Sequence, residues 1–218
     1  LNAAMLALQA IHANRETFRE DDTVRVHGIM TRGGEAVSAV PADVRLEWRV
    51  RSSTLDAVAM NSQKVDRCFK AGALAVGAKV KITNIPGYLP LINDPLLQEL
   101  FYQNAISLLG KDAVGVRPAT ANRGGSTDMG DLSQIMPVCH PYAAGATGTG
   151  HGNDYIVRDY EAAVINPAKL LAAAVIDLLA DGAARAREIV ANARPPLTRD
   201  QYVAFQRQRA EVIEYDGS

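Results

Sequence analysis

Two short segments in the second half of the sequence gather side chains that can bind metals or hold substrates. The first, residues 124–131 with the sequence GGSTDMGD, places two hydroxyls and two carboxylates on a glycine-rich stretch. Such a stretch can bring backbone N–H groups and acidic side chains to one point. Taken alone, two aspartates at this spacing more often form a turn with side-chain hydrogen bonds than a catalytic pair. The candidate residues are Ser126, Thr127, Asp128 and Asp131.

The second segment contains two histidines. His140 lies in PVCHPY, residues 137–142, and His151 lies in GTGHG, residues 148–152. A neutral imidazole is a good zinc ligand, and a histidine flanked by glycines is sterically open to a metal ion. One histidine cannot hold a metal, so on these residues alone His151 is more simply a loop histidine.

A third group lies on a predicted β-hairpin in the first half. Apolar and charged residues alternate along the second strand, which indicates a half-buried strand, and the Gly33-Gly34 pair favours a turn. Arg51 ends this strand, and its guanidinium fits a carboxylate. Arg45 and Arg49 share its face, so a solvated strand face is the simpler alternative. The strands are predicted at residues 23–31 and 41–52.

The first 83 residues are predicted to form one domain that positions this hairpin. The periodicity predicts a helix over residues 1–20, a second over 55–76 that stops at Gly77, and a strand over 79–83. The order helix, strand, strand, helix, strand is typical of a ferredoxin-like domain whose first strand is absent. Since Leu1 already lies inside a helical pattern, we expect further residues upstream. The apolar face of the first helix is predicted to consist of Leu1, Met5, Leu8, Ile11, Arg15 and Phe18.

Residues 84–218 are predicted to form a second domain. The Pro- and Gly-rich stretch 84–94 is the expected crossing, and Asn93 or Asp94 then caps a helix with Pro95 in its first turn, ending at Gly110. Residues 111–157 are expected to be mostly irregular. The helix over 168–180 is apolar nearly all round and is expected to be buried, and Thr198 caps a polar C-terminal helix.

Composition narrows the classes of function. The 218 residues carry a formal net charge of -1, which does not suggest a nucleic-acid-binding protein. We expect no membrane span, because no uninterrupted apolar run approaches the roughly 18 residues required. Cys68 and Cys139 lie far apart and in no zinc-finger spacing, so we expect reduced thiols and a cytoplasmic protein.

Together, residues 25–52 and 124–152 resemble the dinuclear-metal exopeptidases and amidohydrolases that include aminoacylase. The strand RVHGIMTRGG and the later strand ending in arginine-serine are similar to the dimerisation domain of that family, and GGSTDMGDLSQIMPVCHPY with its following glycine-histidine pair is similar to the catalytic domain. The STDMGD and HPY combination indicates the branch of aminobenzoyl-glutamate and β-alanyl-dipeptide hydrolases. The resemblance implies a ferredoxin-like dimerisation (lid) domain followed by the C-terminal part of a zinc-peptidase-like α/β catalytic domain.

The resemblance also implies chemistry and residue roles. It implies hydrolysis of an amide bond of an N-acyl amino acid, aminobenzoyl-glutamate or dipeptide-like substrate by a metal-bridged hydroxide, with a glutamate as general base. Two divalent metals, Zn, Mn or Ni, would occupy the intact site, and His151 matches one ligand. Arg51 matches a residue that binds the substrate carboxylate, and we expect His140 to contact substrate. Ser38 stands where the family usually has an asparagine that contacts the substrate. A serine is shorter and offers one hydroxyl instead of an amide, so the contact to the substrate would differ.

Most of the family's site has no counterpart here. The family draws most of its metal ligands, its general base and its lid histidine from an N-terminal half that has no counterpart in these 218 residues. We therefore assign no catalytic residue to this chain. We expect this chain to be part of an amidohydrolase and to be inactive by itself. We expect it to form a homodimer through the lid domain, or to bind a partner that carries the N-terminal half. The alternative is a truncated, inactive homologue that acts as a dimerisation module. No nucleic-acid or membrane partner is expected.

Overall fold

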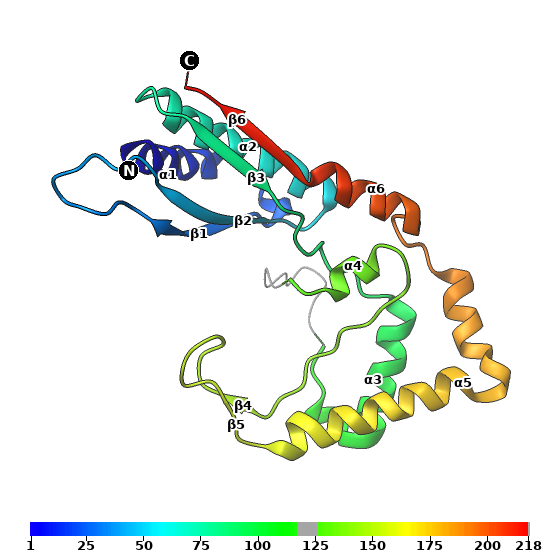
Figure 1. Cartoon of the computed structure of the whole chain (residues 1–218). Helices are drawn as coiled ribbons and strands as arrows, with labels where there is room; N and C mark the ends of the chain where they lie inside the picture. Colours follow the sequence, from blue (N-terminus) through cyan, green and yellow to red (C-terminus); the bar gives the residue numbers. More distant parts are fainter. Residues whose placement is uncertain (117–125, 218) are drawn as a thin grey trace. The chain divides into compact units, whose positions relative to one another are not determined.

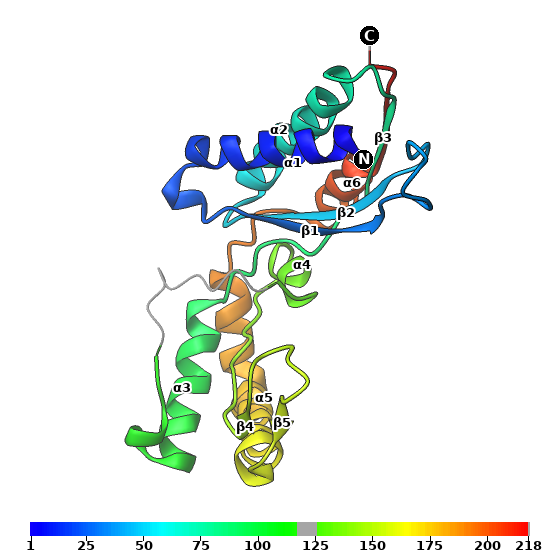
Figure 2. The same ribbon diagram turned by 90° about the vertical axis from the view of Figure 1, so that its left-hand side faces the viewer.

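The computed structural model describes residues 1–116 and 126–217, which divide into two compact units. Unit 1 holds residues 1–90 together with the C-terminal stretch from Asp200, and unit 2 holds most of the residues between them. Helices and small antiparallel sheets occur in both units, which is compatible with the predicted α/β class. Figures 1 and 2 show the elements of each unit from two sides.

Unit 1 contains the predicted hairpin. Strands β1 (Arg25–Arg32) and β2 (Arg45–Arg51) pair antiparallel, with Val26 opposite Val50 and a bulge between Met30 and Arg32. Helices α1 (Asn2–Asn14) and α2 (Leu55–Leu74) pack on one face of this hairpin, as both views show. Two 3-10 turns, Arg15–Thr17 and Glu20–Asp22, connect α1 to β1.

The caps of α2 follow the local sequence. The Thr54 hydroxyl accepts a hydrogen bond from the Ala57 N–H, and Gly77 takes a left-handed conformation (φ 63°) just after the helix. Only glycine adopts this conformation without steric cost, so Gly77 stops the helix as predicted. The core beneath the hairpin is small and apolar, with Ile11, Val26, Val65 and Cys68 at its centre.

The predicted apolar face of α1 is wrong in part. Ile11 is buried as expected, but Leu1 and Met5 are 41% and 54% exposed, while Ala4 and Ala7 are buried. The reason is close packing against α2, where a Cβ built on Gly72 would lie 2.7 Å from the Ala7 nitrogen. Small residues therefore face the neighbouring helix, and the α-helix ends before Arg15 and Phe18.

A second sheet in unit 1 joins distant parts of the chain. Strand β3 (Val80–Asn84) pairs antiparallel with β6 (Glu211–Tyr215), which follows α6 (Arg199–Arg209), and the two strands lie side by side in Figure 1. The predicted helix after Thr198 is confirmed by α6, but β6 was not predicted. Among the described residues, β2 and β3 belong to separate two-stranded sheets.

Unit 2 is built around two helices. Helix α3 (Pro95–Leu109) is capped by Asp94, whose Oδ1 accepts hydrogen bonds from the Leu96 and Leu97 N–H groups, as the sequence predicts. The long helix α5 (Asn166–Asn192) follows a π-helical turn, Glu161–Ile165, and is interrupted by non-helical backbone at residues 180–183. The remaining elements are the 3-10 turn Lys111–Ala113, the helix α4 (Met129–Ser133), and the paired strands β4 (Ala146–Thr147) and β5 (Ile156–Val157).

The burial expected for α5 is not found. Only Ala174 and Ile189 of this helix are buried, whereas Leu171, Ile176 and Leu179 are each more than half exposed. The segment Glu161–Asn192 is also long and apolar enough to meet a length and composition test for a membrane span, contrary to our sequence expectation. This test is weak support for a membrane segment, because core helices of soluble proteins also meet it.

Candidate functional site

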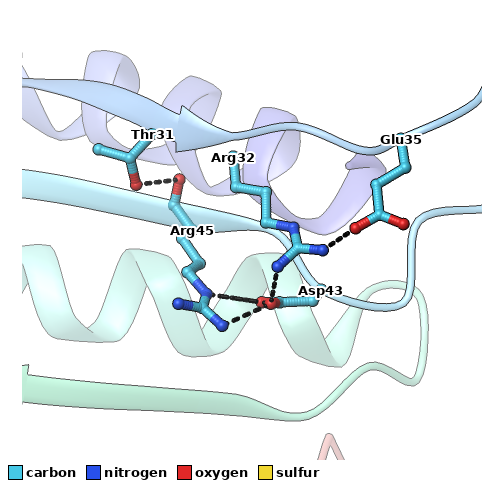
Figure 3. A network of polar contacts seen from close by, with 5 residues as sticks. All are labelled: Thr31, Arg32, Glu35, Asp43 and Arg45. Atoms are coloured by element: carbon cyan, nitrogen blue, oxygen red, sulfur yellow. Dashed lines mark hydrogen bonds and ion pairs between the residues drawn. The ribbon is translucent and has the colours of Figure 1, made fainter.

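The base of the β1–β2 loop is tied by a network of charged side chains (Figure 3). The Asp43 carboxylate accepts hydrogen bonds from the Arg45 Nε at 3.0 Å and from the Arg32 Nη1 at 3.1 Å, and Arg32 also pairs with Glu35. The hydrogen bond from Arg45 is the main cause that lowers the pKa of Asp43. Exposed ion pairs of this kind add little to the stability of the fold. Here they link side chains from the two ends of the β1–β2 loop.

Ser38 lies at the exposed tip of this loop. The Ala39 N–H donates a hydrogen bond to the Ala36 carbonyl, and the neighbouring Val37 and Val40 side chains are essentially fully exposed. Two exposed valines beside a serine give the tip an apolar surface with one hydroxyl. This tip could contact a ligand through van der Waals packing and one hydrogen bond.

Arg51 ends β2, where the chain turns into α2. The Ser52 hydroxyl and the Ser53 N–H donate hydrogen bonds to the Asp22 carbonyl, at 2.6 and 2.9 Å, and these bonds anchor the strand end. Burial and then the charges of Arg49 and Arg25 lower the pKa of the Arg51 guanidinium, which remains charged at neutral pH. Its surroundings are therefore strongly cationic and favour an anion.

His140 lies in a segment that hydrogen bonds fasten to the start of α3. The His140 N–H donates to the Asn93 Oδ1 at 2.9 Å, and the Asp94 N–H donates to the Val138 carbonyl at 2.7 Å. The imidazole packs edge-on against the Tyr142 ring, with centroids 5.3 Å apart. Its Nδ1 is buried without a hydrogen-bond partner among the described residues. A buried polar atom in that condition is uncommon in folded proteins.

His151 lies in the turn between β4 and β5. It adopts a left-handed conformation with φ 66°, which histidine takes more often than most residues but which remains uncommon. The Gly152 N–H donates to the Thr149 carbonyl at 2.7 Å, and the Thr149 N–H donates to the Asp154 carboxylate at 3.2 Å. These bonds hold the turn, and the His151 side chain is exposed.

The acidic segment leads into the short helix α4. Asp128 precedes this helix and is exposed, Asp131 lies within it and is half-buried, and Ser126 and Thr127 before it are half-buried. The glycines predicted to shape this turn, at positions 124 and 125, lie outside the described residues. Within the described part, the placement of α4 brings no third carboxylate or histidine to these aspartates to make a metal cluster.

The structure also assigns positioning roles that the sequence analysis missed. The Ser133 hydroxyl accepts a hydrogen bond from the Ile92 N–H, and the Gln134 carbonyl accepts one from the Leu197 N–H. Ser133 and Gln134 are both buried. The sequence indicates Asn93 only as a candidate helix cap, whereas in the structure its side chain accepts a hydrogen bond from the His140 N–H. A polar residue beside the true cap Asp94 was the available signal.

The described residues do not form a metal centre. In residues 1–116 and 126–217, no group of three or more histidine, cysteine, aspartate or glutamate side chains is placed to hold a metal ion. Burial, and then the charge of Asp94, raises the pKa of the Cys139 thiol to about 11, so this sulfur is protonated at neutral pH and is a poor metal ligand. Ser38 and Arg51 belong to unit 1, and His140 and His151 belong to unit 2.

Comparison with known proteins gives a distant relationship. No protein-family model matches the chain. It is 28% identical over 185 residues to Xaa-Arg dipeptidase from Mus musculus, and 27% identical over 185 residues to Xaa-Arg dipeptidase from Homo sapiens. Each match covers 82% of this chain, and the chain spans 42% of the length of these curated relatives. The similarity supports a relationship of this chain to peptidases and amidohydrolases.

Proposed function

We propose that this chain is part of a metal-dependent amidohydrolase or peptidase that cleaves an amide bond of an N-acyl amino acid, aminobenzoyl-glutamate or dipeptide-like substrate. The observation that carries the proposal is the similarity to Xaa-Arg dipeptidases over 185 residues. That similarity covers 82% of the chain, which exceeds either unit alone.

In this proposal the β1–β2 hairpin belongs to a ferredoxin-like lid domain and binds the substrate. Arg51 holds the substrate carboxylate, since it stands at the anchored end of β2 and its guanidinium lies near the charges of Arg49 and Arg25. Ser38 contacts the substrate from the exposed loop tip, and the Arg32–Asp43–Arg45 network keeps the base of that loop closed.

The remaining predicted residues lie later in the chain. His140 binds substrate through its ring, whose Nδ1 lacks a partner among the described residues, and the loop at Ser126, Thr127, Asp128 and Asp131 shapes the site. His151 is one ligand of two divalent metals, Zn, Mn or Ni. Because a single histidine cannot retain such an ion, the other ligands and the general base would come from residues outside those described.

The test measures hydrolysis by the chain alone and then by a longer protein. With Zn, Mn or Ni added, we expect no turnover of Xaa-Arg dipeptides or aminobenzoyl-glutamate by the purified 218 residues. Sequencing the DNA upstream of the Leu1 codon should reveal further reading frame with histidine and glutamate ligands, and the protein that includes it should be active. Turnover by the chain alone would overturn the claim that its site is incomplete.

In the active protein, Arg51→Gln should raise KM with little change in kcat, because it removes a contact to a nonreacting part of the substrate. Arg45→Gln is the matched control, since Arg45 lies on the same strand but is held by Asp43. Equal effects of the two substitutions would contradict the assignment of Arg51 to the substrate carboxylate.

A second candidate function is dimerisation without catalysis. In the described part of the chain β2 is the only strand that pairs with β1, so no strand covers the other edge of β1, and Ile29 on this strand is 63% exposed. Open strand edges favour pairing with another chain. Sedimentation equilibrium should show a dimer that Ile29→Lys weakens and that Leu74→Lys, at an exposed position at the end of α2, leaves intact. A strict monomer at high protein concentration would exclude this function.

The exposed apolar side chains of α5 are the remaining indication of a partner. We propose that they pack against the N-terminal half of the same enzyme or, where that half is absent, against another copy of this chain.

We also propose a cytoplasmic location. The two free cysteines, with no disulfide between them, are in keeping with this proposal.

A further inference from the structure

The outer face of the β1–β2 hairpin concentrates positive charge. In the antiparallel register, Arg25 stands opposite Arg51 and His27 stands opposite Arg49. Residues directly opposite each other project to the same side of a sheet, and alternate pairs share one face. Val26 and Val50 form the intervening pair, which packs on the helices. The four basic residues therefore project together from the opposite face.

This arrangement is electrostatically unfavourable by itself. Like charges directly opposite each other destabilise an antiparallel pair. The side chains of Arg25, His27 and Arg49 are exposed, and no ion pair joins any of them to a carboxylate within residues 1–116 and 126–217. The acidic residue on the same face, Glu47, stands opposite Ile29, two pairs beyond His27 and Arg49 in the register.

The neighbouring basic residues behave differently. Arg32 and Arg45, at the other end of the same hairpin, both form ion pairs with Asp43, and Arg32 also pairs with Glu35 (Figure 3). On the first three pairs of the hairpin the sequence offers no such carboxylate on this face. Within the described residues Arg25, His27 and Arg49 thus form no ion pair, whereas Arg32 and Arg45 on the same two strands do, so an anion from outside the hairpin would offset the charge of the first group.

We propose that Arg25, His27 and Arg49 form a binding site for a small oxyanion that carries at least two negative charges, such as a phosphate group or a dicarboxylate. Guanidinium groups suit both, because their planar N–H groups make paired, charge-assisted hydrogen bonds to carboxylate and phosphate oxygens. This anion site lies beside Arg51, but it does not depend on Arg51 binding a substrate carboxylate. The anion site can therefore be tested separately from the hydrolase activity proposed above.

The imidazole of His27 gives this site an internal reporter. Burial, and then the charges of Arg51, Arg49, Arg25 and Arg15, lower the pKa of His27. Arg15 is the charged group that faces the strand from the connection after α1, and its Nη2 donates to the Val26 carbonyl at 2.9 Å. A bound anion stabilises the imidazolium, so it must raise the pKa of His27.

The test titrates the whole chain with inorganic phosphate and with glutarate, using chloride and acetate at equal ionic strength as references for nonspecific screening. Saturable binding is expected by calorimetry, with NMR shift changes centred on residues 25–27 and 49. Binding of phosphate alone would identify a phosphate ligand, and binding of glutarate alone a dicarboxylate. Binding of both supports a site that selects charge, and an effect equal to that of chloride would overturn the proposal.

Variants locate the site. Arg49→Gln and Arg25→Gln should each weaken binding about tenfold, equivalent to 1.4 kcal/mol, because each removes a charge-assisted hydrogen-bond donor. Arg45→Gln is the matched control and should leave the dissociation constant unchanged. Equal weakening by Arg45→Gln would show that net charge, rather than this face, attracts the anion.

One readout uses the wild-type chain, and a variant serves only to assign the signal. In the wild-type chain, phosphate should raise the pKa of His27, followed by the imidazole NMR signals, and should not perturb the NMR signals of His12, whose side chain is exposed on α1. His27→Gln assigns the signal. A pKa of His27 that does not move at saturating phosphate would overturn the proposal.

Discussion

The side chain of Asn93 accepts a hydrogen bond from the backbone N–H of His140, at 2.9 Å, across 47 residues of sequence. Together with the bond from the Asp94 N–H to the Val138 carbonyl, it fixes the segment that carries His140 to the start of α3. The position of the candidate substrate-binding histidine therefore depends on a residue that carries out no chemistry itself.

Removing this acceptor should loosen the His140 segment. Asn93→Ala leaves the half-buried His140 N–H without its partner, which should cost about 1–3 kcal/mol of unfolding free energy. Hydrogen exchange at the His140 amide should accelerate. Asn93→Asp keeps an acceptor oxygen at the same position and serves as the control. Unchanged exchange in Asn93→Ala would show that the bond does not hold the segment.

The close approach of α1 and α2 can be tested at Gly72. A Cβ at this position would lie 2.7 Å from the Ala7 nitrogen and 2.8 Å from its Cβ, besides meeting the Ala3 carbonyl. Since helix backbones cannot yield as flexible side chains do, Gly72→Ala should destabilise the protein by about 1–3 kcal/mol. Urea denaturation measures this loss. Ala71→Ser, on the exposed side of the same helix, should change stability by less than about 0.5 kcal/mol.

Cys139 should be unreactive at neutral pH. Burial, followed by the nearby charge of Asp94, raises the pKa of its thiol to about 11, so little thiolate is present at pH 8. Iodoacetamide should modify it far more slowly than free cysteine, as followed by peptide mass spectrometry. Asp94→Asn removes the charge, keeps a good helix cap and should speed the reaction. Rapid modification of the wild-type thiol at pH 8 would contradict the raised pKa.

Asp66 on α2 should make stability depend on pH. Burial is the main cause that raises the pKa of Asp66, and the charge of Glu211 raises it further, although the Asn84 side chain donates a hydrogen bond to it at 3.1 Å. The folded state therefore favours the protonated form, and stability is lost as the pH rises from the ordinary value near 3.8 through the raised pKa.

Asp66→Asn should accordingly gain stability relative to the wild type as the pH increases from 4 to 7, measured by thermal unfolding. The same substitution at Asp56, in the exposed first turn of α2, removes a favourable interaction with the helix dipole. It should cost about 0.3–1 kcal/mol at pH 7. If both substitutions had the same sign at pH 7, burial would not be the source of the pH dependence at Asp66.

The sequence by itself determined the local elements. The alternation over residues 41–52 predicted β2, and Gly77 and Asp94 marked the ends of α2 and α3 correctly. These features depend on interactions between residues a few positions apart, such as a cap with the next helical turn, so a short pattern contains them. Short segments also identified the candidate site residues. They could not show which of these residues lie together in space, and a binding site requires that.

Only the tertiary structure decided which surfaces meet. It turned Ala4 and Ala7 of α1 inward in place of Leu1 and Met5, because Gly72 lets the two helices approach closely. It paired β3 with a strand more than 120 residues later. It also set Arg25 opposite Arg51, which a sequence cannot reveal because the alternation of one strand does not fix its register with another. Packing and register arise from contacts between distant segments, and those contacts exist only once the chain has folded.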